Sequence, residues 1–141
     1  MSNIEVRIAD WQKDNSDLRR IRERVFIDEQ GVSPEQEWDS QDVHAIHFLA
    51  EADNFAMGTA RLLPDGCIGR VSVLKEWRGL KVGEALMQAA IAEAERRGLR
   101  EQTLTAQTHA THFYERLGFK TVSDEFIEAG IPHIDMLRVS E

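Results

Sequence analysis

The segment from residue 45 to residue 97 constrains the fold most strongly, because it joins three strands by tight turns and then leads into one long helix. The first turn is Asp53-Asn54, and the second is Pro64-Asp65-Gly66, where proline presets φ and glycine accepts a positive value. Strands joined by turns this short pair with antiparallel neighbours. The segment therefore predicts an antiparallel meander followed by a helix. The strands cover residues 45–50, 55–63 and 68–74, and the helix covers residues 83–97.

The remaining elements alternate between helices and strands. Leu18, Ile21, Val25 and Phe26 recur at helical spacing, which predicts a helix over residues 15–29. Ser33-Pro34 is typical of the start of a short further helix. Hairpins and crossovers together predict one α+β domain over residues 1–141, with a mixed central sheet, partly antiparallel and partly parallel, flanked by helices. The other predicted elements are strands over residues 4–8, 102–106, 119–126 and 133–139, and a helix over residues 111–117.

Composition excludes several classes of partner. The 141 residues carry 17 basic and 25 acidic side chains, a net charge of −8, which gives no field to attract nucleic acid. No apolar window approaches the roughly 18 residues of a membrane span, and no apolar signal block follows Met1. Cys67 is the single cysteine, so no internal disulfide can form. We expect a cytoplasmic protein without nucleic-acid or membrane partners.

The loop between the third meander strand and the long helix has the composition of an anion site. Free backbone N–H groups at a helix N-terminus carry partial positive charge, and Gly79 and Gly83 permit close approach of a ligand. Residues 75–81 hold three cations against one carboxylate, opposite in sign to the whole chain. The loop lacks the spacing of the Walker and dinucleotide-binding motifs, which argues against ATP and NAD. An ordinary connection with turn glycines and solvated lysines is the alternative interpretation.

Two motifs resemble the GNAT superfamily of N-acetyltransferases. Residues 78–83, Arg-Gly-Leu-Lys-Val-Gly, are similar to its pyrophosphate-binding signature Gln/Arg-x-x-Gly-x-Gly/Ala. Residues 106–119, which include Phe113-Tyr114 and Gly118-Phe119, are similar to its second motif. The order of elements agrees over nearly the whole chain. Residues 22–32 and 130–133 further resemble the small ElaA-like branch of the superfamily.

The resemblance implies a site for acetyl-CoA as cosubstrate. Lys81 stands where most members carry the middle glycine, and Gln107 replaces a common asparagine while keeping an amide. Tyr114 occupies the general-acid position, and a backbone N–H of the strand at residues 71–73 would polarise the thioester carbonyl. A tyrosine that only packs in the core is the alternative. The implied cofactor-binding residues are Val71, Ser72, Val73, Arg78, Gly79, Leu80, Lys81, Val82, Gly83, Glu84, Gln107 and Tyr114.

The general base is less sharply indicated. Glu29 ends the first helix where this fold lines its acceptor cleft, and His133 has a side chain able to take a proton. Each has a plain alternative: a solvated carboxylate for Glu29, and a hydrogen bond to a loop for His133. His47, in an apolar strand, is expected in the core, and Cys67 is expected as a small buried hydrophobe. No spacing of histidines and cysteines indicates a metal.

The acceptor half of the site is the most open question. The acidic loop with Glu37, Asp39 and Asp42 would favour a cationic acceptor if it borders the cleft, and is otherwise a solvated loop. We expect acetyl transfer from acetyl-CoA to a primary amine of a small molecule or peptide, by direct transfer. A non-catalytic acyl-CoA-binding module that keeps the fold is the alternative. Acyl chain length stays open, and a homodimer is suggested by the family alone.

Overall fold

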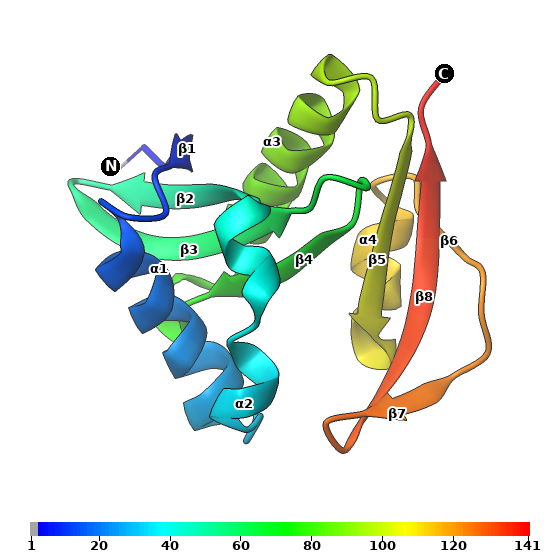
Figure 1. Ribbon diagram of the computed structural model, residues 1–141, viewed down its shortest axis with the longest axis horizontal. Helices are drawn as coiled ribbons and strands as arrows, with labels where there is room; N and C mark the ends of the chain where they lie inside the picture. Colours follow the sequence, from blue (N-terminus) through cyan, green and yellow to red (C-terminus); the bar gives the residue numbers. More distant parts are fainter. Residues whose placement is uncertain (1–2) are drawn as a thin grey trace.

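The structure is a computed structural model that describes residues 3–141 as two antiparallel sheets flanked by helices (Figure 1). The first sheet has the order β1-β2-β3-β4, and the second has the order β5-β8-β6, with β7 also paired to β8. The strands are β1 (Glu5–Ala9), β2 (Ile46–Ala52), β3 (Phe55–Leu62), β4 (Ile68–Val73), β5 (Glu101–Gln107), β6 (Lys120–Thr121), β7 (Phe126–Glu128) and β8 (Ile131–Val139).

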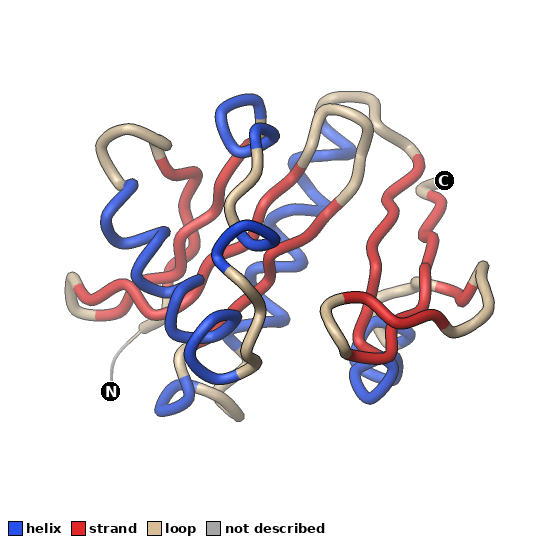
Figure 2. The backbone as a smooth tube through the Cα atoms, turned by 60° about the horizontal axis from the view of Figure 1, so that its bottom comes forward, coloured by secondary structure: helices blue, strands red, loops and turns tan. Residues whose placement is uncertain are grey.

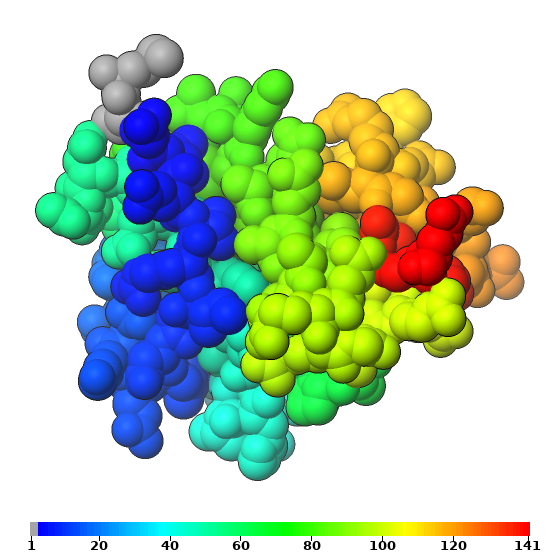
Figure 3. Space-filling model, turned by 90° about the horizontal axis from the view of Figure 1, so that it is seen from above, coloured from blue at the N-terminus to red at the C-terminus, as the bar shows by residue number. Residues whose placement is uncertain are grey.

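Helices cover both faces of the first sheet. The tube in Figure 2 places α1 and α3 on opposite sides of β3, and the view from above places α3 in the middle of the molecule (Figure 3). Gly58 allows this contact, because a Cβ there would lie 3.0 Å from Val82 and 3.1 Å from Leu86 of α3. The helices are α1 (Asn15–Arg22), α2 (Pro34–Glu37), α3 (Val82–Arg96) and α4 (Thr111–Glu115), with a π-helix η1 (Glu23–Glu29) and 3₁₀ turns η2 (Ser40–His44), η3 (Lys75–Trp77) and η4 (Thr108–Ala110).

The structure confirms the α+β class and the antiparallel meander. The Asp53-Asn54 turn has the positive φ angles of 51° and 65° that suit a two-residue hairpin. Three predictions need correction. The helix predicted over residues 15–29 changes at Glu23 into a π-helix, and the strand predicted over residues 119–126 is two short strands, β6 and β7. The mixed sheet predicted as partly parallel is instead two antiparallel sheets. Parallel pairing in the described chain is confined to one bridge, between Cys67 and Thr103.

That bridge sets the geometry of the site. The Thr103 N–H donates to the Gly66 carbonyl (3.1 Å), and Gly66 is packed so closely that a Cβ would lie 2.4 Å from the Glu101 carbonyl oxygen. From this point β4 and β5 run in the same direction without further pairing, and they separate (Figure 1). A cavity lies where these strands separate, lined by residues 68–71 of β4 and by Leu104 and Thr105 of β5. Within residues 3–141, no helix is long and apolar enough to cross a membrane.

Candidate active site

A cavity of about 550 Å³ lies between the separating strands β4 and β5. Its walls come from both sheets, from the end of the first helix, from α2 and from the hairpin that joins β7 to β8. This volume is within the range of small-molecule sites, roughly 300–1,000 Å³. Four of the residues predicted for catalysis or cofactor binding line it: Val71, Gln107, Tyr114 and His133.

Tyr114 lines the cavity and packs its ring against other aromatic side chains. Its ring makes edge contacts with Phe113 and Phe119, with centroids 5.0 Å and 6.2 Å away. Burial raises the pKa of the Tyr114 phenol to about 12, so the hydroxyl keeps its proton at neutral pH. A protonated phenol facing a cavity can act as a proton donor. The core-packing and functional interpretations are therefore compatible.

The loop ahead of α3 leaves the start of that helix without a side-chain cap. Lys81, the N-cap residue, lies in the left-handed region at φ 64° and ψ 23°, and Gly79 has φ +82°. The first N–H groups of a 15-residue helix are thus available to an anion. A Cβ on Gly83 would lie 3.5 Å from the Phe113 ring and 3.9 Å from Val73, so Gly83 lies beside both β4 and α4.

The loop and the cavity are adjacent but distinct. Residues 78–84 do not line the cavity; Arg78, Gly79, Leu80 and Lys81 are exposed, and Val82 is buried in the core. Strand β4 connects the two, because Val71 lines the cavity and the Val73 carbonyl accepts a hydrogen bond from Arg78 Nε (2.9 Å). Ser72 is buried, and its hydroxyl donates to the Arg70 carbonyl (3.2 Å).

Glu29 lies beside the loop. Its carboxylate pairs with the Arg78 guanidinium (Nη1 to Oε2, 2.9 Å), and it does not line the cavity. The neighbouring residue Gln30 does line it. The structure thus joins a predicted base to a predicted cofactor-binding residue. The Glu29 carboxylate therefore lies outside the cavity that Tyr114 lines.

Gln107 bridges the two sides of the cleft. Its amide nitrogen donates to the Gln30 side chain (2.8 Å), although Gln30 lies 77 positions earlier in the sequence. The Gln107 carbonyl oxygen accepts from His109 Nε2 (2.7 Å). Both ends of the Gln107 side-chain amide therefore have protein partners. A ligand amide that binds Gln107 would have to replace one of these partners or bind beside it.

His133 is buried and lines the cavity. Its Nδ1 lies 2.7 Å from the Ile131 carbonyl oxygen, and because a carbonyl only accepts, Nδ1 carries the hydrogen. The neutral ring then presents Nε2 with a free lone pair, and Nε2 forms no hydrogen bond within residues 3–141. The ring stacks on Phe126, with centroids 6.2 Å apart. The predicted loop contact is present, and it leaves Nε2, a nitrogen able to accept a proton, without a partner; the role of His133 as base stays a prediction.

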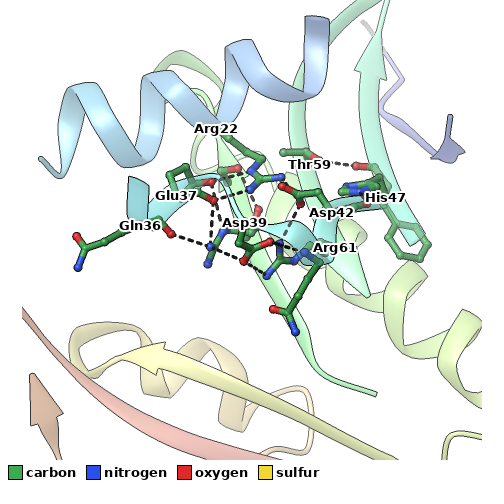
Figure 4. A network of polar contacts seen from close by, with 12 residues as sticks. Arg22, Gln36, Glu37, Asp39, Asp42, His47, Thr59 and Arg61 are labelled. Carbon is green, nitrogen blue, oxygen red and sulfur yellow. Dashed lines mark hydrogen bonds and ion pairs between the residues drawn. The ribbon is translucent and has the colours of Figure 1, made fainter. Parts of the chain in front are cut away.

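A buried network of arginines and carboxylates lies beside the cavity, and its pairs were not predicted from the sequence (Figure 4). Asp42 lies between Arg22 and Arg61 and accepts from both, at 2.8 Å and 2.9 Å. Arg22 also pairs with Glu37 (2.7 Å). Burial would raise the pKa of Asp42, but hydrogen bonds from the two arginines hold it below its usual value. One signal was present in the sequence, because Arg22 lies on the apolar stripe of the first helix.

This network changes the interpretation of the acidic loop. Asp39 pairs with Arg61 (2.9 Å) and with Arg70 (3.3 Å), so all three loop carboxylates have arginine partners. A cationic acceptor was expected on the assumption that these carboxylates are free. Their ion pairs remove that support. Glu128 lines the cavity and forms no ion pair among the described residues.

The remaining predicted residues have plain structural positions. His47 is buried, as expected, and stacks on Trp11. Cys67 is half-buried at the cavity wall, and burial raises the pKa of its thiol, which disfavours the nucleophilic thiolate. Within residues 3–141 no three His, Cys, Asp or Glu side chains are grouped as metal ligands.

Comparison with known proteins agrees with this geometry. A family model described as the acetyltransferase (GNAT) domain matches residues 15–139. The N-acetyltransferase YjcF of Bacillus subtilis is 34% identical, covering 93% of this chain and 96% of YjcF. The structure of an acyl-CoA N-acyltransferase from Pseudomonas aeruginosa is 32% identical with a TM-score of 0.84, covering 99% and 100% of the two chains. Escherichia coli ElaA is 30% identical with a TM-score of 0.84, covering 98% and 99%.

Proposed function

Because this chain belongs to the GNAT family of acetyltransferases, we propose that it moves an acetyl group from acetyl-CoA to a primary amine by direct transfer. Membership of the family itself makes the chain a GNAT-fold N-acetyltransferase of the acyl-CoA class. The identity of the acyl donor and of the acceptor belongs to the proposal. So do a cytoplasmic location and the homodimer suggested by the family.

One observation carries the proposal: the uncapped start of α3 lies beside the cavity that Tyr114 faces. Gly83, within the first turn of α3, approaches Phe113, the neighbour of Tyr114, at 3.5 Å from its ideal Cβ position. A ligand with a phosphate at one end and a reactive group at the other could therefore use both features. The available N–H groups and the cations Arg78 and Lys81 fit a pyrophosphate.

The residues of the cavity then divide the chemistry. Bound acetyl-CoA supplies an activated thioester. The N–H groups of β4 near Val71 polarise its carbonyl. His133 Nε2 takes the proton that the amine loses as its nitrogen bonds to the acetyl carbon. The Tyr114 hydroxyl protonates the departing sulfur, and burial, which raises the Tyr114 pKa, keeps the hydroxyl protonated beforehand.

Glu29 acts on the cofactor side of this proposal. Its carboxylate holds Arg78, which also binds the end of β4, and a bound pyrophosphate competes with Glu29 for that guanidinium. A role as base would require Glu29 to release Arg78 and turn into the cavity.

The test is amine-dependent release of the CoA thiol from acetyl-CoA, measured across a panel of small amines. We expect turnover with the wild-type protein and a loss of kcat in His133→Ala. A ligand-induced rise of Tm with no thiol release for any amine would favour the binding-only alternative. Turnover that is unaffected by His133→Ala would remove His133 as the base.

A further inference from the structure

Arg70 lines the cavity from a strained position in β4. It has φ 52°, a left-handed value, where one extra residue of β4 interrupts the pairing with β3. A non-glycine residue in this region is strained and persists where the surrounding structure holds it. The bulge directs the Arg70 guanidinium toward α2 and the cavity.

The Arg70 guanidinium is only partly used. Nη2 contacts the carbonyl oxygens of Gln36 (3.2 Å) and Glu37 (3.1 Å) and the Asp39 carboxylate (3.3 Å). Nε has no hydrogen bond and lies 3.4 Å from Glu37 Oε2. Nη1 has no acceptor among residues 3–141, and Arg70 lines the cavity. This contrasts with Arg22, whose three nitrogens all donate to carboxylates or a carbonyl.

Arg61 provides a second incomplete arginine on the same wall. Its side chain is 6% exposed, it lines the cavity, and its Nε is buried without an acceptor. A buried N–H left without a partner is unfavourable. Arg70 and Arg61 thus place two incompletely bonded guanidinium groups on one wall of the cavity.

The charge of the network points in the same direction. Arg22, Arg61 and Arg70 face the carboxylates of Glu37, Asp39 and Asp42, which gives formal neutrality. Burial raises the pKa of Glu37 and thereby weakens the ionised form of one of the three carboxylates. Burial also lowers the pKa of Arg70, because its partners do not fully compensate for lost hydration. An additional negative charge would compensate for it.

Part of the remaining cavity wall is apolar. Phe26 and Val32 line it from the side of the first helix, and Leu104 and Ile131 line it from the second sheet, whereas Glu128 adds a carboxylate that suits the amine end of an acceptor. The apolar part gains free energy from contact with hydrocarbon. An acceptor that fills the cavity would thus combine an apolar body with one anionic group near Arg70.

We propose that the acceptor is a small amine that carries a carboxylate, bound by Arg70 Nη1, and an apolar side group. The inference rests on the proposed function, since it names the acceptor class of that site. Arg70 is then a specificity-determining residue, because its Nη1 pairs with the carboxylate of the acceptor. Tyr114 and His133, the proposed proton donor and acceptor, line the same cavity. Nη2 is engaged and Nε is buried 3.4 Å from Glu37 Oε2, so Nη1 is the nitrogen left to pair with a single carboxylate.

The binding test does not depend on turnover. Calorimetric titration in the presence of CoA compares three probes of one shape: 3-phenylpropionate, its uncharged amide, and 2-phenylethylphosphonate. We expect the carboxylate to bind about 10-fold or more tighter than the amide, the scale of a hydrogen bond to a charged group. Arg70→Gln should remove this difference, and Arg70→Lys should keep part of it. Arg24→Gln, at an exposed arginine with no hydrogen-bond or ion-pair partner in the described chain, should leave the difference intact.

Each outcome decides the matter. Equal binding of carboxylate and amide, or binding of neither at millimolar concentration, would overturn the proposal, and so would a carboxylate preference that survives Arg70→Gln. Tighter binding of the phosphonate would assign Arg70 to a phosphate-bearing acceptor instead. Turnover distinguishes failure of the carboxylate site from failure of the proposed function. Acetylation of phenethylamine and L-phenylalanine with equal KM would contradict the carboxylate site but would still support acetyltransferase activity.

Arg70→Gln could disturb the fold, because it leaves buried Glu37 with Arg22 as its remaining partner. Arg70→Lys covers this case, since it keeps a cation beside Glu37 and loses the planar fork. In Arg70→Lys, KM for L-phenylalanine should rise more than kcat falls. An unchanged KM in a folded Arg70→Lys variant would contradict a direct contact.

Discussion

Arg78 and Glu29 form an ion pair, with Nη1 2.9 Å from Oε2, that joins the end of the first helix to the loop ahead of α3. The same guanidinium donates through Nε to the Val73 carbonyl at the end of β4. One side chain thus connects three elements that border the proposed pyrophosphate site. Both partners are partly exposed, at 43% and 35%, so the pair itself adds little to stability.

Glu29→Gln should tighten acetyl-CoA binding rather than weaken it. Glu29 competes with a phosphate for Arg78, and an exposed ion pair is worth up to about 1 kcal/mol, so Kd should fall by a factor of roughly 2–5. Titration calorimetry measures this, with Asp28→Asn as the control at the adjacent exposed carboxylate. A large fall in kcat with unchanged Kd would instead restore Glu29 as the general base.

Tyr114→Phe should lower kcat by about 100-fold or more, the usual contribution of general acid catalysis. The phenylalanine ring can keep the edge contacts with Phe113 and Phe119, so the fold and acetyl-CoA affinity should stay within about twofold. Steady-state kinetics and calorimetry on the same preparations check both statements. Full turnover in Tyr114→Phe would show that the sulfur is protonated by another group.

Lys81→Gly should stabilise the protein by about 1 kcal/mol, because Lys81 holds a left-handed conformation that glycine adopts without strain. Urea unfolding measures the change. Lys81→Ala removes the same ammonium but keeps the strain, so it should show no such gain. If the ammonium binds pyrophosphate, the two variants should weaken acetyl-CoA binding equally; different losses would mean that the backbone at this position matters more than the charge.

The buried His47 should make stability depend on pH. Its Nε2 donates to the Asp42 carbonyl (2.8 Å), and its Nδ1 is buried without a partner, so the neutral ring is the form that fits. Burial lowers the pKa of His47 from its ordinary value of 6.5. The unfolded chain therefore takes up a proton first, and this contribution is complete above pH 6.5 and is lost as the pH falls below it.

Thermal unfolding at pH 7.5 and at pH 5.5 checks this dependence. Wild-type Tm should fall over this interval by more than that of His47→Gln, whose amide can donate to the same carbonyl without taking up a proton. Equal falls in the two proteins would assign the acid sensitivity to other groups.

The fold was largely predictable because its signals are local. The Asp53-Asn54 turn, the period of α3 and the motif around Tyr114 each lie within a short stretch of sequence. The contacts that shape the site are not local: Gln107 meets Gln30, and Arg70 meets Glu37, across long separations that neither periodicity nor turn chemistry encodes. Arg22 shows the intermediate case. Its place on an apolar stripe implies a buried partner, but the sequence does not say which carboxylate provides it.

The central claim is that the start of α3 binds acetyl-CoA, and thermal unfolding with this ligand tests it most directly. At about 100 times Kd, acetyl-CoA should add roughly 2.7 kcal/mol and raise Tm by several degrees, whereas NAD and ATP should not. Gly83→Asp is the matched variant: its Cβ has room, and a carboxylate in the first turn suits the helix, but it repels phosphates. The account predicts a shift for the wild type and none for Gly83→Asp. No shift for the wild type at millimolar acetyl-CoA, or an equal shift in Gly83→Asp, would contradict it.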